Sequence, residues 1–160
     1  MVDIKPALER LGLTLPEVVP PVATYQPAVR SGNYIYVSGQ LPVSDGQIVA
    51  TGKVGAEIDV DQAYDLARLC AINGLAAIAS VVDFAEVKSI VKVTGFVASA
   101  PGFNAQPKVI NGASELFGEV MGEAGKHARS AVGVSELPLN VPVEVDLIAE
   151  LNVSGTTYLA

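Results

Sequence analysis

The chain has 160 residues, half of them apolar and 17% charged, with a formal net charge of −7. Its ten Lys and Arg residues are scattered along an acidic sequence, which argues against nucleic-acid binding as the main function. The length fits one domain, residues 1–160, and an apolar content this high with so few charges predicts burial of apolar surface against another subunit.

The N-terminal segment, residues 1–21, is expected to form a short helix followed by a proline-containing arm. Over residues 3–11 the apolar side chains recur at helical spacing, and Gly12 ends the pattern. The first residues show no basic segment before an apolar run, so no secretory signal is expected. The single cysteine excludes an internal disulfide and fits a reducing compartment, so we expect a cytoplasmic protein.

Two strands and a loop are expected next. Residues 22–29 resemble a strand, Arg30-Ser31-Gly32-Asn33 is a hairpin turn signal, and the return strand covers residues 34–37 and ends at Ser38-Gly39-Gln40. The glycine-rich residues 41–56 are expected to form a loop with a small hairpin at Asp45-Gly46.

The strongest helix pattern begins after Asp59 and continues to about Val82. Asp59 is a suitable N-cap, and Gln62 stands at the capping-box position. Arg68 and Asn73 interrupt its apolar run, which favours a buried helix over a membrane span. Its apolar positions cover more than one stripe and predict deep burial: Ala63, Leu66, Ala67, Cys70, Leu75, Ile78, Ala79 and Val82.

The rest of the chain predicts a strand over 86–98, a turn at Pro101-Gly102, and a helix over 105–121 that Gly122 and Gly125 end. Two strands follow, near 129–134 and 143–153. The order strand, strand, helix, strand, helix, strand, strand predicts an α+β fold in which two helices cover one face of a single, mostly antiparallel sheet.

Candidate chemistry is concentrated in the last two strands. Arg129 suits two-pronged binding of a carboxylate, and Glu144 could orient a water or accept a proton. We expect them to face each other across a small pocket. His127 lies two residues before Arg129, so both side chains should project on one side of a strand, where His127 is either a proton carrier or a surface residue. The sequence has no Cys/His cluster that would predict a metal site, and it has no glycine-rich loop of the phosphate-binding pattern.

Three segments of the chain resemble the RidA/YjgF family of reactive-intermediate deaminases. They are Tyr25 with residues 31–42, Asn111 within the second helix, and Ala128-Arg129-Ser130 with Leu137-Pro138 and Val143-Glu144-Val145. The resemblance implies a chorismate-mutase-like fold and a homotrimer with ligand sites in clefts between subunits. It also implies no metal or organic cofactor.

The resemblance further implies roles for individual residues. Arg129 would bind the substrate carboxylate, and Glu144 would hold the water that attacks an imine carbon. The pocket would also be lined by Tyr25, Ser38, Gly39 and Asn111. The implied reaction is hydrolysis of 2-aminoacrylate-type enamines, through their imines, to a 2-oxo acid and ammonia.

Each of these residues also has an ordinary structural explanation. Arg129 could form a salt bridge between subunits, and Glu144 could be a solvated strand residue. Tyr25 could simply stabilise a strand, and Ser38 and Gly39 could form a strand-end turn. Asn111 is unfavourable within a helix, which suggests either a ligand contact or a packing hydrogen bond.

The chain departs from the family pattern at three positions, which leaves its function open. His127 replaces a proline or small residue, Ala131 a common cysteine, and Gly133 a frequent acidic residue. One hypothesis is an imine or enamine hydrolase. Another is a protein of the same fold that binds a small carboxylate, such as a 2-oxo acid, without chemistry. A third, RNA cleavage, is disfavoured by the acidic charge and the absence of a basic patch.

Overall fold

The protein is described here by a computed structural model, which covers residues 2–18 and 24–152. Its main sheet has the strand order β1-β2-β7-β5-β6 and is antiparallel except for the β5–β6 pair. The five strands are β1 (Ala28–Ser31), β2 (Tyr34–Gln40), β5 (Val87–Ala98), β6 (Ala128–Val134) and β7 (Val143–Leu151). The predicted α+β architecture is confirmed.

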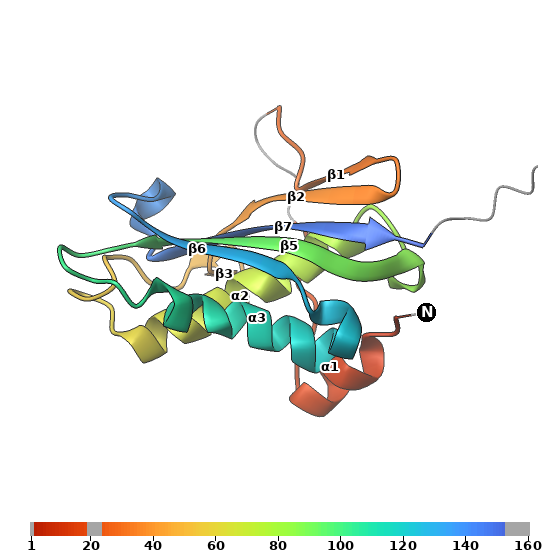
Figure 1. Cartoon of the computed structure of the whole chain (residues 1–160), viewed down its shortest axis with the longest axis horizontal. Helices are drawn as coiled ribbons and strands as arrows, with labels where there is room; N and C mark the ends of the chain where they lie inside the picture. Colours follow the sequence, from red (N-terminus) through yellow and green to blue (C-terminus); the bar gives the residue numbers. More distant parts are fainter. Residues whose placement is uncertain (1, 19–23, 153–160) are drawn as a thin grey trace, which may run out of the picture.

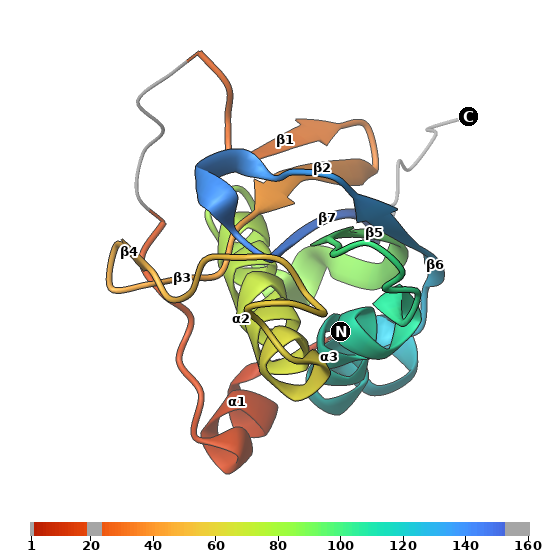
Figure 2. The same ribbon diagram turned by 90° about the vertical axis from the view of Figure 1, so that its left-hand side faces the viewer.

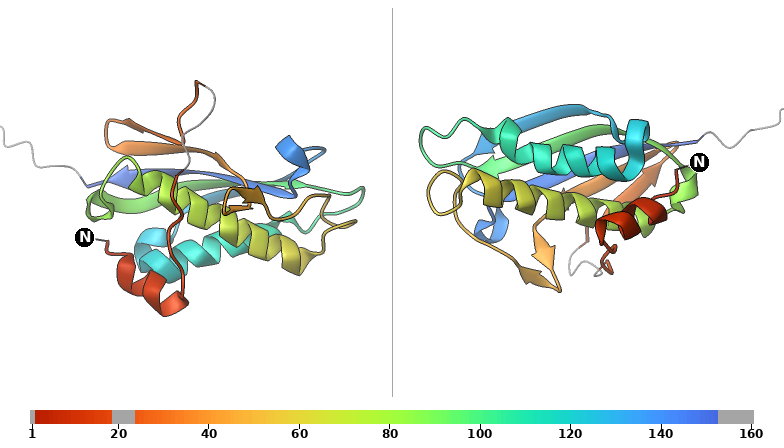
Figure 3. Two further views of the ribbon diagram at one scale, coloured as in Figure 1. Left: turned by 180° about the vertical axis from the view of Figure 1, so that it is seen from behind. Right: turned by 90° about the horizontal axis from the view of Figure 1, so that it is seen from below.

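Helices α2 (Val60–Ala79) and α3 (Gln106–Met121) lie side by side on one face of this sheet (Figure 1; Figure 3, right). The capping box predicted for α2 is present, because Asp59 accepts from the Gln62 amide and Gln62 accepts from the Asp59 amide. The core forms between the two layers. Its inward-facing strand residues are fully or almost fully buried: Ile35, Val37, Val93, Val97, Val143, Val145, Leu147 and Ala149.

The two helices approach each other closely at Gly112 of α3. A Cβ at this position would collide with the backbone carbonyl of Tyr64 in α2. A glycine is therefore required for the two helix backbones to pack at this distance. This contact fixes how α3, and the polar residues it carries, sits beside β6.

The short helix α1 (Lys5–Leu11) packs on the helix layer through the buried side chains of Ile4 and Leu8, and Gly12 ends it in the left-handed region as expected. Residues 13–18 then pass toward the hairpin of β3 (Val43–Ser44) and β4 (Gln47–Ile48), as Figure 2 shows. This hairpin turns at Asp45-Gly46, as predicted.

Several predicted boundaries are wrong. The first strand begins at Ala28, not Val22, and continues through Arg30 and Ser31, so only Gly32 and Asn33 form the turn. Residues 22 and 23 lie outside the described part. Helix α2 ends at Ala79, which is exposed, because Ser80 and Val81 turn the chain toward β5.

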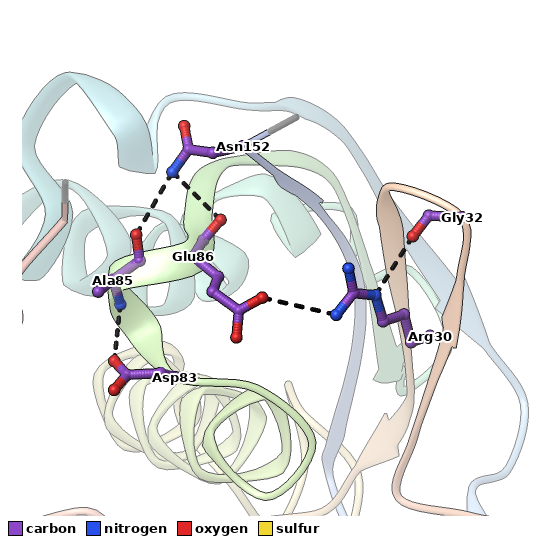
Figure 4. A network of polar contacts seen from close by, with 6 residues as sticks. All are labelled: Arg30, Gly32, Asp83, Ala85, Glu86 and Asn152. Atoms are coloured by element: carbon purple, nitrogen blue, oxygen red, sulfur yellow. Dashed lines mark hydrogen bonds and ion pairs between the residues drawn. The ribbon is translucent and has the colours of Figure 1, made fainter. Parts of the chain in front are cut away.

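Three short 3-10 segments complete the connections: η1 (Phe84–Glu86), η2 (Gly122–Gly125) and η3 (Pro138–Asn140). Polar contacts join η1 to the β1–β2 hairpin and to the end of β7 (Figure 4). Arg30 pairs with Glu86 at 3.5 Å, and the Asn152 amide donates to the backbone carbonyls of Ala85 and Glu86. The Arg30–Glu86 pair thus joins the hairpin to η1, and Asn152 joins η1 to the end of β7.

Strand β2 carries one more residue than its partner β7 near its end. Val37 pairs with Leu147 and Gln40 with Val145, so Ser38 and Gly39 form a bulge. Among the described helices, none has both the length and the apolar character that a membrane crossing requires.

Candidate functional site

Arg129, the second residue of β6, points toward α3. Its Nη1 donates hydrogen bonds to Asn111 Oδ1 at 2.8 Å and to Ser114 Oγ at 3.1 Å. These two acceptors use both hydrogens of Nη1, which leaves the edge formed by Nε and Nη2. No ion pair joins Arg129 to a carboxylate of the described residues. The remaining edge therefore has the geometry for two-pronged binding of a carboxylate.

His127 lies beside Arg129, immediately before β6, and is half-buried. Its Nε2 is 3.0 Å from Ser114 Oγ, and its Nδ1 is 2.6 Å from the carbonyl oxygen of Gly125. Burial lowers the pKa of His127, the nearby Arg129 charge lowers it further, and the Gly125 carbonyl opposes this shift. The imidazole is thus favoured in its neutral form.

A shallow hollow of about 320 Å³ opens at this edge of the sheet. It is lined by Ser114, Gly118, Gly125, Lys126, His127 and Arg129. Lys126 is exposed and pairs with Glu123 at 2.6 Å. The hollow therefore presents a cationic guanidinium, with no acidic side chain among its lining residues.

The other predicted residues gather toward the opposite edge of the sheet. Ser38 Oγ donates to the Gln26 carbonyl at 2.6 Å, and the Glu144 carboxylate occupies the space where a Cβ on Gly39 would lie. Burial, and then the neighbouring charge of Asp146, raise the pKa of Glu144. A half-buried carboxylate with a raised pKa can accept a proton and return it more readily than an ordinary glutamate.

A groove of about 500 Å³ lies beside this second group. Tyr25, 60% exposed, borders it together with Gly39. The rest of the lining comes from the N-terminal arm, the residues next to β1 and at the end of β2, the β3–β4 hairpin and α2: Pro16, Glu17, Val18, Pro27, Gln40, Leu41, Val43, Asp45, Gly46, Asn73 and Ala76. The arm thus forms one wall of the groove.

The expectation that Arg129 and Glu144 face each other is wrong within one chain. Arg129 pairs with Val93, and Glu144 pairs with Phe96 on the same strand, β5. These partners are an odd number of residues apart, so their side chains point to opposite faces of the sheet. Arg129 faces the helices, while Glu144 lies on the open face between the buried Val143 and Val145.

Among the described residues, no three or more His, Cys, Asp or Glu side chains come together in a way that could hold a metal ion. The arrangement can instead bind an anion at Arg129 and exchange a proton at Glu144. Within one chain the two residues do not share a pocket, because they lie on opposite faces of the sheet.

Comparison with known proteins decides the family. Residues 6–151 match the model of the family described as "YjgF/chorismate_mutase-like, putative endoribonuclease".

The chain belongs to the YjgF/chorismate mutase-like family.

Individual relatives of this YjgF-like protein are similar over nearly their whole length. It is 44% identical to Protein TCP17 of Trypanosoma cruzi over 91% of this chain and 92% of that protein. It is 30% identical to the 2-iminobutanoate/2-iminopropanoate deaminase of Dermatophagoides farinae, over 85% and 92%. The crystal structure of Atu1372 from Agrobacterium tumefaciens, of unknown function, has a TM-score of 0.88, 47% identity and coverage of 93% and 92%.

The YjgF-like sequence pattern pointed to Asn111, which the structure places against Arg129. It did not point to Ser114, which contacts both Arg129 and His127. One signal was present: Ser114 follows Asn111 by three residues, so the two share a face of α3. Cys70 is fully buried in the core, as its helical spacing indicated.

Proposed function

We propose that this protein hydrolyses small 2-imino and enamine acids to 2-oxo acids and ammonia, without a cofactor, in clefts between the subunits of a homotrimer. The observation that carries the proposal is Arg129, which lines a hollow and whose Nη1 is held by Asn111 and Ser114. The relative named a 2-iminobutanoate/2-iminopropanoate deaminase supports this reaction class. The same proposal expects the enzyme to act in the cytoplasm and to need no nucleic acid or membrane partner.

The position of the two residue groups supports a site between chains. Arg129 and Asn111 lie at the β6 edge, while Tyr25, Ser38, Gly39 and Glu144 lie toward the β1–β2 side and on or near the open face. That face also exposes large apolar side chains, among them Val29, Tyr34, Tyr36 and Val132. Exposed apolar side chains on a sheet are suited to subunit contact. A second chain would then supply Glu144 to the Arg129 of the first.

The proposed chemistry needs an oriented carboxylate and a proton acceptor. Arg129 would fix the substrate carboxylate, so that the imine carbon lies in one place. Glu144 would accept a proton as water adds to that carbon, and would return it to the nitrogen. The hydroxyl group formed on the carbon then gives up its proton, which Glu144 would pass to the nitrogen, while the C=O bond forms and the C–N bond breaks, so that ammonia leaves and the 2-oxo acid remains. The raised pKa of Glu144 suits a group that both accepts and donates a proton.

A coupled assay tests this function. A pyridoxal-phosphate enzyme generates 2-aminoacrylate from serine, and pyruvate release is followed with and without the protein. We expect the protein to accelerate release and Arg129→Ala to lose at least about 100-fold in kcat/KM, since a charged hydrogen-bonded anchor is removed. Arg30→Ala, which removes a surface ion pair on the β1–β2 hairpin, is the matched control and should stay active. Full activity of Arg129→Ala would contradict the mechanism.

A second function, binding of a 2-oxo acid without turnover, has one structural feature in its favour. Gly133 stands where the family often has an acidic residue, and the Gln106 amide lies against it, bonded to Ser99 Oγ. An acid is therefore missing from the strand that carries Arg129. Stabilisation by pyruvate in a thermal melt, lost in Arg129→Ala and unaccompanied by turnover, would favour this function.

A further inference from the structure

The hydrogen bonds around Arg129 continue beyond its direct contacts into a chain of four groups. Arg129 Nη1 meets Ser114 Oγ at 3.1 Å, Ser114 Oγ meets His127 Nε2 at 3.0 Å, and His127 Nδ1 meets the Gly125 carbonyl at 2.6 Å. The chain starts on β6, crosses to α3 and ends on η2. Its two side chains beyond Arg129 have no part in the proposed chemistry.

The direction of each bond follows from what each group can donate. A carbonyl oxygen only accepts, so His127 Nδ1 must carry the hydrogen in the bond to Gly125. In a neutral imidazole Nε2 is then the acceptor, so the Ser114 hydroxyl donates to it. The Ser114 oxygen in turn accepts from Arg129 Nη1. Every donor and acceptor in the chain is matched only when His127 is neutral and protonated at Nδ1.

We propose that Ser114 and His127 are positioning residues that hold the Arg129 guanidinium in place through this chain, so that its Nε–Nη2 edge meets the substrate carboxylate. The identity of the ligand rests on the proposed function, whereas the hydrogen-bond chain does not. Asn111 holds the same nitrogen from one side, and Ser114 holds it from the other. The rotation of the guanidinium is thereby fixed before a ligand arrives, which lowers the entropy cost of binding.

The surroundings of His127 keep the imidazole in this state. The Phe117 ring of α3 meets it edge to face, with ring centres 5.8 Å apart and planes at 88°. The described carboxylates of α3 and η2 have other partners: Glu115 accepts from Tyr64, Glu119 pairs with Arg68 and Glu123 with Lys126.

Arg129 is therefore the charged side chain that lowers the pKa of His127. A proton on Nε2 would place two cations on either side of Ser114 and would remove the acceptor of the Ser114 hydroxyl hydrogen. Protonation should weaken the hold on Arg129 because the two cations repel each other and the Ser114 hydroxyl loses its fixed direction. Affinity for a carboxylate should fall as the pH falls through the pKa of His127, which lies below its usual value.

The tautomer of His127 is directly measurable because the protein sequence contains a single histidine. Nitrogen-15 NMR of the 160-residue chain at about pH 8 should show the Nδ1–H form of His127, the minor tautomer of free imidazole side chains. The Nε2–H form would overturn the proposal, because Ser114 could not then donate to the ring. This test needs neither substrate nor turnover, so it is independent of the proposed function.

Variants test the effect on Arg129, with pyruvate as the probe. Ser114→Ala should raise the pyruvate Kd about tenfold, and should raise KM more than it lowers kcat. His127→Gln retains an acceptor for the Ser114 hydroxyl and cannot titrate near neutrality. It should bind within about threefold of the wild type at pH 8 and lose the decline at lower pH.

A serine outside the hydrogen-bond chain provides the control. Ser80→Ala removes a hydroxyl that donates only to the Ala77 carbonyl at the end of α2, and should leave the pyruvate Kd unchanged. Unchanged binding in a folded Ser114→Ala, or an unchanged pH dependence in His127→Gln, would overturn the positioning role. A wild type that shows the Nδ1–H tautomer but binds no pyruvate would contradict the proposed function and leave the hydrogen-bond chain supported.

Discussion

At the scale of single residues, Glu144 is the carboxylate whose surroundings are least favourable to its charge. It is half-buried on β7, Asp146 lies on the same face, and no ion pair joins it to a cation of the described residues. A residue held at a cost to the fold is typical of a functional position. The fold therefore gives up stability when Glu144 ionises.

Replacing Glu144 with glutamine should separate stability from function. The pKa of Glu144 is raised in the folded protein, so ionisation costs stability at neutral pH, and this cost disappears as the pH falls below the ordinary glutamate value. Glu144→Gln should therefore raise Tm at about pH 7, leave it nearly unchanged at about pH 4, and abolish turnover. Thermal melts at both pH values check this. A lower Tm at pH 7 would show that the charge is favourably paired.

A glycine is required at position 39 because of the Glu144 side chain beside it, and not because of its backbone conformation. Its φ is not positive, but a Cβ would occupy the position of the Glu144 carboxylate. Gly39→Ala should displace that carboxylate and reduce turnover strongly, with a stability loss of about 1 kcal/mol. In a Glu144→Ala background the same change should cost much less, because the two positions are coupled. Equal stability losses in both backgrounds would show that the two residues act separately.

At the scale of the elements, local sequence signals predicted most of the helices and strands. Asp59 and Gln62 specified the start of α2, and the alternation of Val143, Val145 and Leu147 gave the inward face of β7. The errors occurred where tertiary contacts decide. Residues 24–27 have strand-like neighbours but remain outside β1, because pairing begins only at Ala28 opposite Val37. Pro27, which has no backbone N–H to donate, is a local signal against pairing at that position, but the register of β1 comes from its partner β2.

The packing of α2 on α3 can be tested with two glycines of the same helix. Gly112→Ala places a Cβ against the backbone carbonyl of Tyr64, which cannot move without shifting α2, and should destabilise the protein by about 1–3 kcal/mol. Gly118→Ala meets nothing within 4 Å and should stabilise it by up to about 1 kcal/mol through helix propensity. Urea unfolding of both variants checks the difference. Equal effects would mean that the helices do not pack closely at Gly112.

At the scale of the whole molecule, the sequence named candidate residues but not their arrangement. Arg129 and Glu144 are separated by one short turn along the chain, which suggested a shared pocket. Their faces depend on register across three strands, with Arg129 opposite Val93 and Glu144 opposite Phe96. Strand pairing of this kind is not readable from local spacing. For the same reason, the contact of Ser114 with His127 appeared only in three dimensions.

Mixing two inactive variants tests whether the site forms between chains. Arg129→Ala and Glu144→Gln should each be inactive alone, but after unfolding and refolding together at equal amounts they should recover activity. In a trimer with random assembly, about one quarter of the clefts would combine an intact Arg129 with an intact Glu144. Refolding each variant alone is the control. No recovery in mixed oligomers whose assembly is verified would contradict a site shared between chains.

The bulge of β2 at Ser38 and Gly39 means that the number of residues in this strand affects the position of Gly39. With one residue fewer, Val37 and Gln40 would pair with β7 in regular steps and the sheet would be flatter at this end. Gly39 would no longer lie against Glu144. A deletion of one residue here should therefore preserve the pairing of β2 with β7 and disturb the surroundings of the Glu144 carboxylate.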